Sequence, residues 1–367
     1  MPYPQFDRDK IDFSPLATRP NKVLIERDHI SPTAAPGVLP ADTAGKIADT
    51  VAAMRAARAA GRPVIMAFGA HTIKNGLGPV LIQLLKKGWV QHLATNGAGV
   101  IHDWEFAFQK ESSEDVRANV ARGKFGIWEE TGFHINMAIL LGAYDGLGYG
   151  ESVGRLISSE RHVIPSRKQL LADISQAGAG FAAALRAAGA ADVLALVGKL
   201  GLDSGVMPVA HPGKEFSVQA AAYEAGIPFT SHPMFGHDII YTHPANHGAA
   251  IGRAAERDFL AFARNIGELE GGVYLSIGSA VMSPMIFEKS LSMSRNVAIQ
   301  NGESITHFTI TVVDLAESRW DWSQGEPPMD SPDYYLRYCK TFNRMGGKMS
   351  YIQADNRDFL LHLAQAL

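Results

Sequence analysis

Small and polar residues follow two neighbouring apolar runs early in the chain, and their types could bind a nucleotide. The first run, Val64–Phe68, ends at Gly69, and the second, residues 90–94, is followed by the loop Asn96-Gly97-Ala98-Gly99. Glycine lets a backbone approach a phosphate closely, and open parallel sheets bind ligands at the carboxyl ends of their strands. The two loops therefore predict a nucleotide or dinucleotide site at one edge of a sheet.

A third loop of small residues strengthens this interpretation. Gly278-Ser279-Ala280 ends a later apolar run, and His71 and Thr72 continue the loop that begins at Gly69. None of the three matches the GxGxxG or Walker pattern, so each alone could be a tight turn that binds nothing. Three such loops at strand ends favour binding, because the ends of parallel strands meet at one edge.

The elements that must position these loops alternate regularly from residue 42 onward. The expected strands are 64–68, 90–94, 191–197, 227–232, 272–278, 307–315 and 348–354. The expected helices are 42–60, 79–87, one from about 102, 112–123, 132–146, 166–188, 216–226, 248–267, one from about 284, 332–343 and 356–366. Nearly all the strands are apolar on both faces, which is typical of a parallel sheet covered by helices on both sides.

The predicted fold class is therefore α/β: a single large Rossmann-like doubly wound parallel sheet. The proline-rich residues 1–40 are expected to form an extended N-terminal arm, and residues 41–367 the Rossmann-like nucleotide-binding domain. No composition shift or linker divides the second segment, so one large domain is favoured over two.

Composition limits the classes of partner. The chain has 367 residues, 46% hydrophobic residues, a net charge of −3 and a single cysteine, Cys339. This charge favours neither nucleic acid nor an anionic membrane, and one cysteine excludes a disulfide framework. The N-terminus lacks a signal-peptide pattern, and no apolar run reaches the roughly 18 residues that span a bilayer. We expect a soluble cytoplasmic protein with a small-molecule partner.

A histidine-rich segment offers a different chemistry. His232, His237, Asp238, His243 and His247 lie close together in sequence, and such groups can bind a divalent metal. The spacing is not HExxH, and prolines interrupt any common helical face, so a polar pocket without metal is favoured. A metal-dependent hydrolase centred on this cluster is kept as an alternative function.

Lys340 is a third candidate, in the segment PDYYLRYCK. A lysine on an aromatic-rich helix can be desolvated, which lowers its pKa and makes the neutral amine a nucleophile for imine formation. The alternative is a surface lysine whose stem runs past Tyr338, and the pattern alone favours that alternative.

Taken together, these segments resemble the deoxyhypusine synthase family over roughly residues 60–367. The similar segments are GAHTIKNGLGPVLIQLLKKGWVQHLATNGAGVIHD, GIPFTSHPMFGHDI, GGVYLSIGSAVMSPMIF and PDYYLRYCK. The resemblance implies NAD in a Rossmann-like sheet, and a homotetramer or homodimer with active sites between subunits. It also implies an NAD-dependent transferase that passes an alkyl (aminobutyl) group from a polyamine through a lysine imine.

The resemblance assigns roles residue by residue. Lys340 would form the imine, and His102 stands where the family has an active-site carboxylate. The NAD contacts implied are His71, Thr72, Asn96, Gly97, Ala98, Gly99, Asp103, Gly278 and Asp355. No metal ligand is implied.

Departures from the family pattern alter the expected substrate. Ile101 and His102 stand where the family has two carboxylates, so the acidic clamp that a polyamine requires is lost. The prediction is therefore an NAD-dependent enzyme acting on a polyamine or another amine, and not deoxyhypusine synthesis itself. A non-catalytic nucleotide-binding protein is the remaining alternative.

Overall fold

Six parallel strands form the centre of the molecule. The structure is a computed structural model, and it describes residues 3–367. The strands are β2 (Val64–Phe68), β3 (His92–Thr95), β7 (Phe229–Ser231), β8 (Val273–Ile277), β9 (Thr309–Asp314) and β10 (Lys348–Gln353). Their order across the sheet is β10-β9-β8-β2-β3-β7, and every neighbouring pair is parallel. This confirms the predicted doubly wound α/β fold.

The order of the strands is that of the Rossmann fold. The chain builds outward from β2 through β3 to β7, then returns to the other side of β2 and continues through β8 and β9 to β10. The direction of winding therefore reverses between β2 and β8. Such a reversal is the topological switch point, where open α/β sheets bind ligands outside the carboxyl ends of the strands.

Both faces of the sheet are apolar because both are covered by helices. Along β2, Val64, Met66 and Phe68 belong to one buried cluster, while Ile65 and Ala67 belong to a second cluster on the opposite face. This alternation is the period of two that a strand imposes on its side chains. Helices α2, α4 and α15 pack on the first face, and α12, α13 and α14 on the second.

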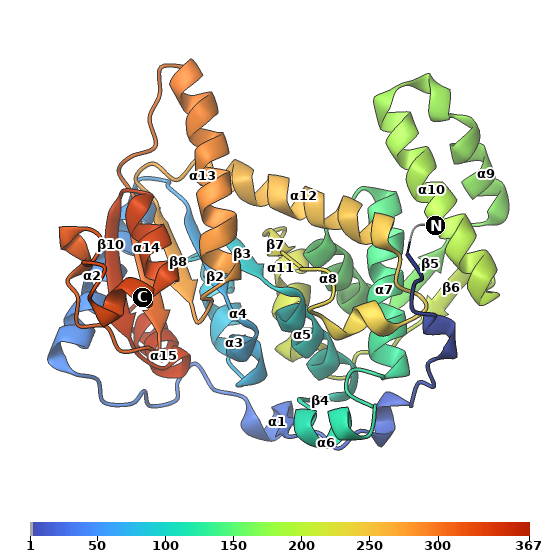
Figure 1. Cartoon of the computed structure of the whole chain (residues 1–367), viewed down its shortest axis with the longest axis horizontal. Coiled ribbons are helices and arrows are strands. Elements are labelled where there is room, and N and C mark those ends of the chain that lie inside the picture. Colours follow the sequence, from blue (N-terminus) through green and yellow to red (C-terminus); the bar gives the residue numbers. More distant parts are fainter. Residues whose placement is uncertain (1–2) are drawn as a thin grey trace.

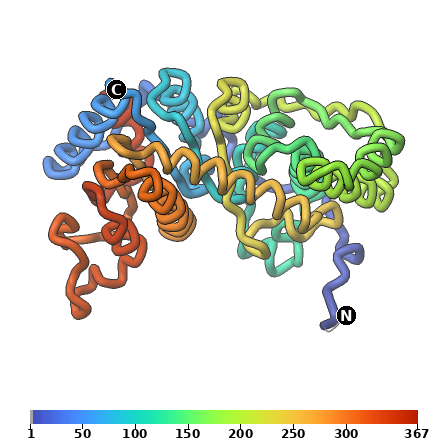
Figure 2. The backbone as a smooth tube through the Cα atoms, turned by 90° about the horizontal axis from the view of Figure 1, so that it is seen from above, coloured from blue at the N-terminus to red at the C-terminus, as the bar shows by residue number. Residues whose placement is uncertain are grey.

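The helices around the sheet are uneven in length. They are α1 (Ile25–Asp28), α2 (Ala41–Ala59), α3 (Ala70–Lys74), α4 (Gly78–Lys86), α5 (Gly97–Gln109), α6 (Val116–Ala121), α7 (Glu129–Asp145), α8 (Tyr149–Ser159), α9 (Arg167–Ser175), α10 (Phe181–Leu200), α11 (Val218–Glu224), α12 (Gly248–Ile266), α13 (Met282–Gln300), α14 (Arg337–Arg344) and α15 (Asn356–Ala366). Two short antiparallel pairs complete the fold, β1 (Val23–Leu24) with β4 (Glu111–Ser112) and β5 (Arg161–Ile164) with β6 (Gly205–Pro208). Figures 1 and 2 show α12 extending from the sheet toward the helical part around α7 and α10.

The strand predicted at 191–197 is wrong, because these residues lie inside helix α10. The run is rich in alanine, valine and leucine, and its periodicity alone does not separate a buried strand from a helix. Gly180, at φ 136°, divides the single helix expected over 166–188 into α9 and α10. The sequence analysis also missed α3 and α8, and α5 begins at Gly97 rather than near His102.

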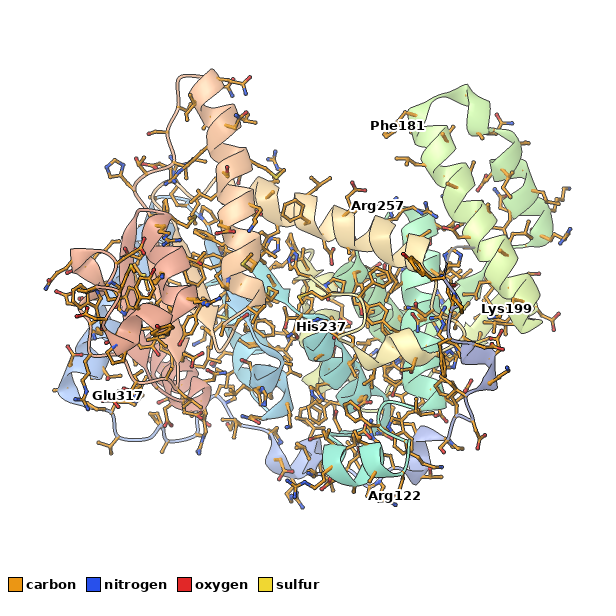
Figure 3. All side chains as sticks on the ribbon, viewed as in Figure 1. Arg122, Phe181, Lys199, His237, Arg257 and Glu317 are labelled. Carbon is orange, nitrogen blue, oxygen red and sulfur yellow. The ribbon has the colours of Figure 1, made fainter. Side chains whose placement is uncertain are left out.

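Helix α10 is also long and apolar enough to cross a membrane by length and composition alone. The expectation that no such segment exists was therefore incomplete. Only 28% of its most apolar stretch is buried in the structure. Arg186, Asp192 and Lys199 interrupt it, and it packs along α9 and α7. Figure 3 shows Phe181 and Lys199 near its two ends.

The N-terminal segment lies against the rest of the molecule. It runs along the lower edge in Figure 1, from the helical part to α2. Leu16 and Ile25 are buried, and the guanidinium of Arg19 binds both oxygens of Glu105 in α5. The division into an arm (1–40) and a domain (41–367) stays a prediction.

Candidate functional site

The loops after β2 and β8 meet at the switch point in direct backbone contact. The N–H of Gly69 donates to the carbonyl of Ile277 at 3.0 Å, and a Cβ at Gly69 would lie 2.1 Å from the Gly278 oxygen. Gly278 has φ +54°, in the left-handed region that favours glycine. The close approach of these two loops therefore requires glycine at both Gly69 and Gly278.

Asn356, which the sequence analysis did not identify, extends this contact to β10. Its amide donates to the Thr72 hydroxyl at 3.2 Å, and a Cβ at Gly278 would lie 2.6 Å from the same amide. Asp355, whose NAD contact stays a prediction, accepts from the Arg357 N–H at 2.8 Å and caps α15. The ends of β2, β8 and β10 are thus connected through Asn356.

The loop after β3 is shaped by a carboxyl group. Asn96 caps α5 by accepting from the Gly99 N–H at 3.0 Å, and a Cβ at Gly97 would lie 2.1 Å from Asp238 Oδ2. Asp238 therefore lies against the first turn of α5. A phosphate bound at Gly97 and Ala98 would meet this carboxyl, so their predicted NAD contacts, like those of Asn96 and Gly99, stay predictions.

Near pH 7 the carboxyl group of Asp238 is partly charged and partly neutral. Its Oδ2 is buried and has no hydrogen-bond partner among residues 3–367. Burial raises the pKa of the Asp238 carboxyl to about 7, although the Ala98 N–H lowers it. A buried polar atom without a partner is costly, and such atoms in native proteins require an explanation.

Asp238 borders a cavity of about 210 Å³ on the carboxyl side of β2, β3 and β7. The apolar lining is Ala98, Ile101, Val116, Phe125 and Ile239. The polar lining is Arg19, Lys74, His102, Glu105, Ser113, Glu114, His237 and Asp238. Figure 3 shows His237 near the middle of the molecule. Helix α3 begins at the switch point and ends at Lys74, so the cavity and the switch point share this helix.

His102 faces the cavity at the end of a chain of hydrogen bonds. Its Nδ1 lies 2.7 Å from the Ser112 hydroxyl, which donates to Glu105 Oε2 at 2.5 Å. Glu105 also accepts from both terminal nitrogens of Arg19, at 2.9 and 2.6 Å, and from Thr131 at 2.9 Å. Burial alone would raise the pKa of Glu105, but Arg19, His102 and Ser112 together lower it. Glu105 is therefore ionised.

Burial lowers the pKa of His102 to about 4. The charge of Glu105 opposes this shift, while Lys74, Arg19 and His71 add to it. The imidazole is thus neutral at neutral pH. His102, predicted as catalytic, lies in the cavity, and His71 lies near it on the exposed side of α3.

Asp103, whose NAD contact stays a prediction, forms a network of buried hydrogen bonds. Its carboxylate is buried and accepts from the Ser217 hydroxyl at 2.6 Å, from the Val218 N–H at 2.9 Å and from the Gln219 side chain at 2.9 Å. These contacts hold the first turn of α11.

Lys340 and His102, the two predicted catalytic residues, are not brought together. Lys340 lies on α14, which packs on β10 and α13, and its Nζ lies 3.2 Å from the centroid of the Tyr334 ring. It does not line the cavity. Burial raises the pKa of the neighbouring Cys339 thiol, which keeps that thiol protonated.

The histidine-rich segment does not form a metal site. His232 bonds to Thr230 at 3.0 Å, His243 faces Glu129 at 3.3 Å, and His247 lies 3.9 Å from Asp192. Among residues 3–367 no three histidine, cysteine, aspartate or glutamate side chains could hold a metal ion together. The metal-dependent hydrolase loses its structural basis.

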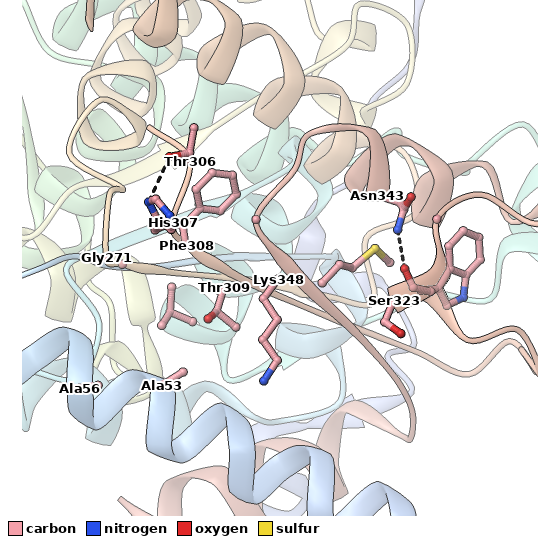
Figure 4. A pocket seen from close by; sticks show the side chains of 16 residues that line it. Ala53, Ala56, Gly271, Thr306, His307, Phe308, Thr309, Ser323, Asn343 and Lys348 are labelled. Atoms are coloured by element: carbon pink, nitrogen blue, oxygen red, sulfur yellow. Dashed lines mark hydrogen bonds between the residues drawn. The ribbon is translucent and has the colours of Figure 1, made fainter. Parts of the chain in front are cut away.

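A larger hollow lies at the opposite edge of the sheet. It has a volume of about 830 Å³ and is lined by the first residues of β8, β9 and β10 and by one face of α2. Figure 4 shows Ala53, Thr309 and Lys348 around it. Because doubly wound sheets bind ligands at the carboxyl ends of their strands, the smaller cavity is the stronger candidate.

Comparisons with known proteins give distant structural similarity only. No protein-family model matches the sequence, and no curated protein matches it. The solved structures that match include ArgZ, an arginine dihydrolase from the ornithine-ammonia cycle in cyanobacteria, at 13% identity and a TM-score of 0.41. A ternary complex of AgrE with ornithine and NAD+ matches at 14% identity and a TM-score of 0.42. A putative LOR/SDH protein from Methanococcus maripaludis S2 matches at 12% identity and a TM-score of 0.43.

The matches differ in how much of each protein they cover. The matches to ArgZ and AgrE include 90% of the residues of this chain, and the match to the LOR/SDH protein includes 95%. The chain spans about a third of the ArgZ and AgrE chains, 33% and 34%, and 75% of the LOR/SDH chain. The TM-scores are too low to assign the chain to the family of any of these proteins.

The resemblance to deoxyhypusine synthase is corrected by these findings. No family model supports it, and the structural matches named above are arginine dihydrolase-like and LOR/SDH-like proteins. The short motifs reflected strand-end loops that many doubly wound sheets share. The polyamine substrate, the aminobutyl transfer and the homotetramer rested on that resemblance and lose their basis with it.

Proposed function

We propose that this protein is an NAD-dependent enzyme that acts on a small polar molecule. The observation that carries the proposal is the switch point between β2 and β8, where Gly69 and Gly278 bring two strand ends into backbone contact. In doubly wound sheets this position is where dinucleotides bind. The cytoplasmic location and the small-molecule partner stay predictions that accompany this proposal.

The residues at the switch point fit a dinucleotide better than those at the first turn of α5. Gly69, Ala70 and Ser279 present little side-chain bulk, and Asn356 adds an amide beside them. Asp238 lies against α5, where its carboxyl would compete with a phosphate. NAD would supply a hydride acceptor. We therefore place it beside β2 and β8.

The chain's own residues would carry out the remaining chemistry in the adjoining cavity. His102 is neutral and can accept a hydrogen bond, Lys74 supplies a positive charge, and Asp238 supplies a carboxyl. These groups bind and orient a polar substrate, while Ile101 and Ile239 limit the access of water. The reaction class proposed is hydride transfer coupled to loss of a proton.

Calorimetry with NAD+, NADH and ADP-ribose tests this proposal. We expect micromolar binding, and we expect Ala70→Asp to weaken it at least tenfold because its charge repels the pyrophosphate. Ala53→Asp, an equivalent change beside the opposite hollow, should leave the affinity unchanged. Failure of all three ligands to bind would refute the proposal. Binding without hydride transfer to or from any small substrate would instead support a non-catalytic nucleotide-binding protein.

A further inference from the structure

We infer that the cavity beside His102 is a binding site for a small amino acid, and that His102 Nε2 accepts a hydrogen bond from its amino group. The inference rests on the proposed function, because it places the substrate beside the proposed dinucleotide. It is carried by the direction of the hydrogen bonds around His102, by the charges of the cavity and by its size.

The hydrogen-bond chain determines which nitrogen of His102 carries the proton. Ionised Glu105 can only accept, so the single hydroxyl proton of Ser112 must be donated to it. The Ser112 oxygen is then an acceptor for His102 Nδ1, which must carry the imidazole proton. In the neutral ring this leaves a lone pair on Nε2. Nε2 has no hydrogen-bond partner among residues 3–367.

The hydrogen bonds from His102 through Ser112 to Glu105 remain possible when Nε2 is protonated. When Nε2 is protonated, Nδ1 still donates to Ser112 and Ser112 still donates to Glu105, so no side chain has to turn. The negative charge of Glu105 favours the cationic ring. Ser112 and Glu105 therefore act as positioning residues for His102, as the third group does in acid–base triads.

Two further groups supply the cavity with a positive charge and with a carboxyl group that is partly ionised near pH 7. The ammonium of Lys74 makes no ion pair or hydrogen bond with any other of residues 3–367. Asp238, whose Oδ2 is buried against Gly97 without a hydrogen-bond partner among the described residues, borders the same cavity. A carboxylate would pair with Lys74, and an ammonium would bind to Asp238 and to the Nε2 lone pair of His102.

The volume restricts the ligand to a small molecule. A cavity of about 210 Å³ is smaller than the roughly 300–1,000 Å³ of sites for drug-sized ligands. Its apolar wall, formed in part by Ile101, Phe125 and Ile239, accommodates a short aliphatic side chain. A small amino acid combines these three properties.

The hydrogen bond to His102 needs no change of protonation within the site. The amino group donates one N–H to the Nε2 lone pair of His102 and keeps its proton, so no bond is broken when the ligand binds. The charge of Lys74 lowers the pKa of His102, and a substrate carboxylate bound to Lys74 would offset that effect. The groups that face His102 are Lys74, Glu105, Arg19 and His71, with His237 and Asp238 on the facing segment.

Nitrogen NMR of the full chain labelled with 15N-histidine tests the inference, with His102→Gln to identify the signal. We expect His102 to be a neutral Nδ1–H tautomer at pH 7, Ser112→Ala to lose this single tautomer, and Ser112→Thr to retain it. Ser175→Ala, a change at an exposed helical serine, should have no effect. A neutral Nε2–H tautomer in the unchanged protein would overturn the role of His102.

Ligand titration of the same sample, with and without NADH, tests the substrate class. L-Alanine and L-2-aminobutyrate should shift the Nε2 signal saturably, and lactate, propionate and propylamine should bind at least tenfold more weakly. Lys74→Met should weaken binding of both amino acids at least tenfold, whereas Lys87→Met should not. Equal binding of lactate, or no shift with either amino acid, would refute the class. Loss of NADH binding with amino-acid binding retained would refute the proposed function and leave this site intact.

Discussion

The hollows at the two edges of the sheet differ in whether a buried polar atom on their lining lacks a hydrogen-bond partner. The hollow at the amino edge is about 830 Å³, yet His307 pairs with Glu270 at 2.8 Å and Asn343 donates to the Trp322 carbonyl. The cavity at the carboxyl edge is about 210 Å³, and Asp238 Oδ2 has no hydrogen-bond partner among residues 3–367. The unpaired Asp238 oxygen, and not the volume, therefore distinguishes the carboxyl-edge cavity from the amino-edge hollow, whose lining residues include none of the buried unpaired atoms in the described part of the chain.

The largest expected effect comes from the buried ion pair behind His102. Replacing Arg19 by methionine leaves Glu105 buried without its charged partner, which should lower the free energy of unfolding by about 3–5 kcal/mol. Arg344→Met removes an exposed pair with Glu326 and should cost at most about 1 kcal/mol. Urea unfolding of both variants measures the difference. Equal losses of unfolding free energy in the two variants would show that burial does not strengthen the Arg19–Glu105 pair.

A substitution at Gly97 tests the contact between α5 and Asp238. Gly97→Ala places a methyl group 2.1 Å from Asp238 Oδ2, so we expect a loss of about 1–3 kcal/mol in unfolding free energy. Gly252→Ala, inside α12 with no atom within 4 Å of the added carbon, should stabilise by about 0.5–1 kcal/mol. Thermal and urea unfolding provide the measurement. A second change, Asp238→Ala, should recover part of the Gly97→Ala loss; no recovery would locate the strain elsewhere.

The sheet and its switch point could be predicted because they depend on local pattern. Uninterrupted apolar runs such as Val64–Phe68 indicate buried parallel strands, and glycine-ended strands indicate the functional edge. Residues 191–197 were misassigned because alanine, valine and leucine also suit a helix, and the surrounding helix determined the outcome.

The site itself was only partly predictable, because its contacts join distant parts of the chain. Arg19 and Glu105 are 86 positions apart, and no local spacing connects them. Asp238 was identified, but within a supposed metal cluster, since its position against Gly97 depends on the tertiary fold. His102 was selected through a resemblance that proved wrong, although it does line the cavity.

The pH dependence of stability provides a smaller effect at the carboxyl edge. The folded-state pKa of Asp238 is raised to about 7, so its stabilising contribution is complete below the unfolded pKa of about 3.9 and is lost as the pH rises through 7. Relative to Asp238→Asn, the unchanged protein should lose on the order of 1 kcal/mol between pH 5 and 8, because partial exposure screens the charge. Urea unfolding at several pH values measures this. Parallel pH curves for the two proteins would show that Asp238 does not titrate in this range.

The smallest effect is expected at Lys340, which the sequence suggested as a nucleophile. The ammonium of Lys340 lies over the Tyr334 ring, and such a cation–π contact is weak. Lys340→Met should therefore lower the free energy of unfolding by only about 0.5–1 kcal/mol. NADH affinity and amino-acid binding should not change, because Lys340 lies on α14 and does not line the cavity. Lys74→Met, at the cavity, should have the opposite profile: little change in stability and a large loss of amino-acid binding. A borohydride-trapped adduct on Lys340 with an amine or carbonyl substrate would reverse this comparison and move the chemistry from the cavity to α14.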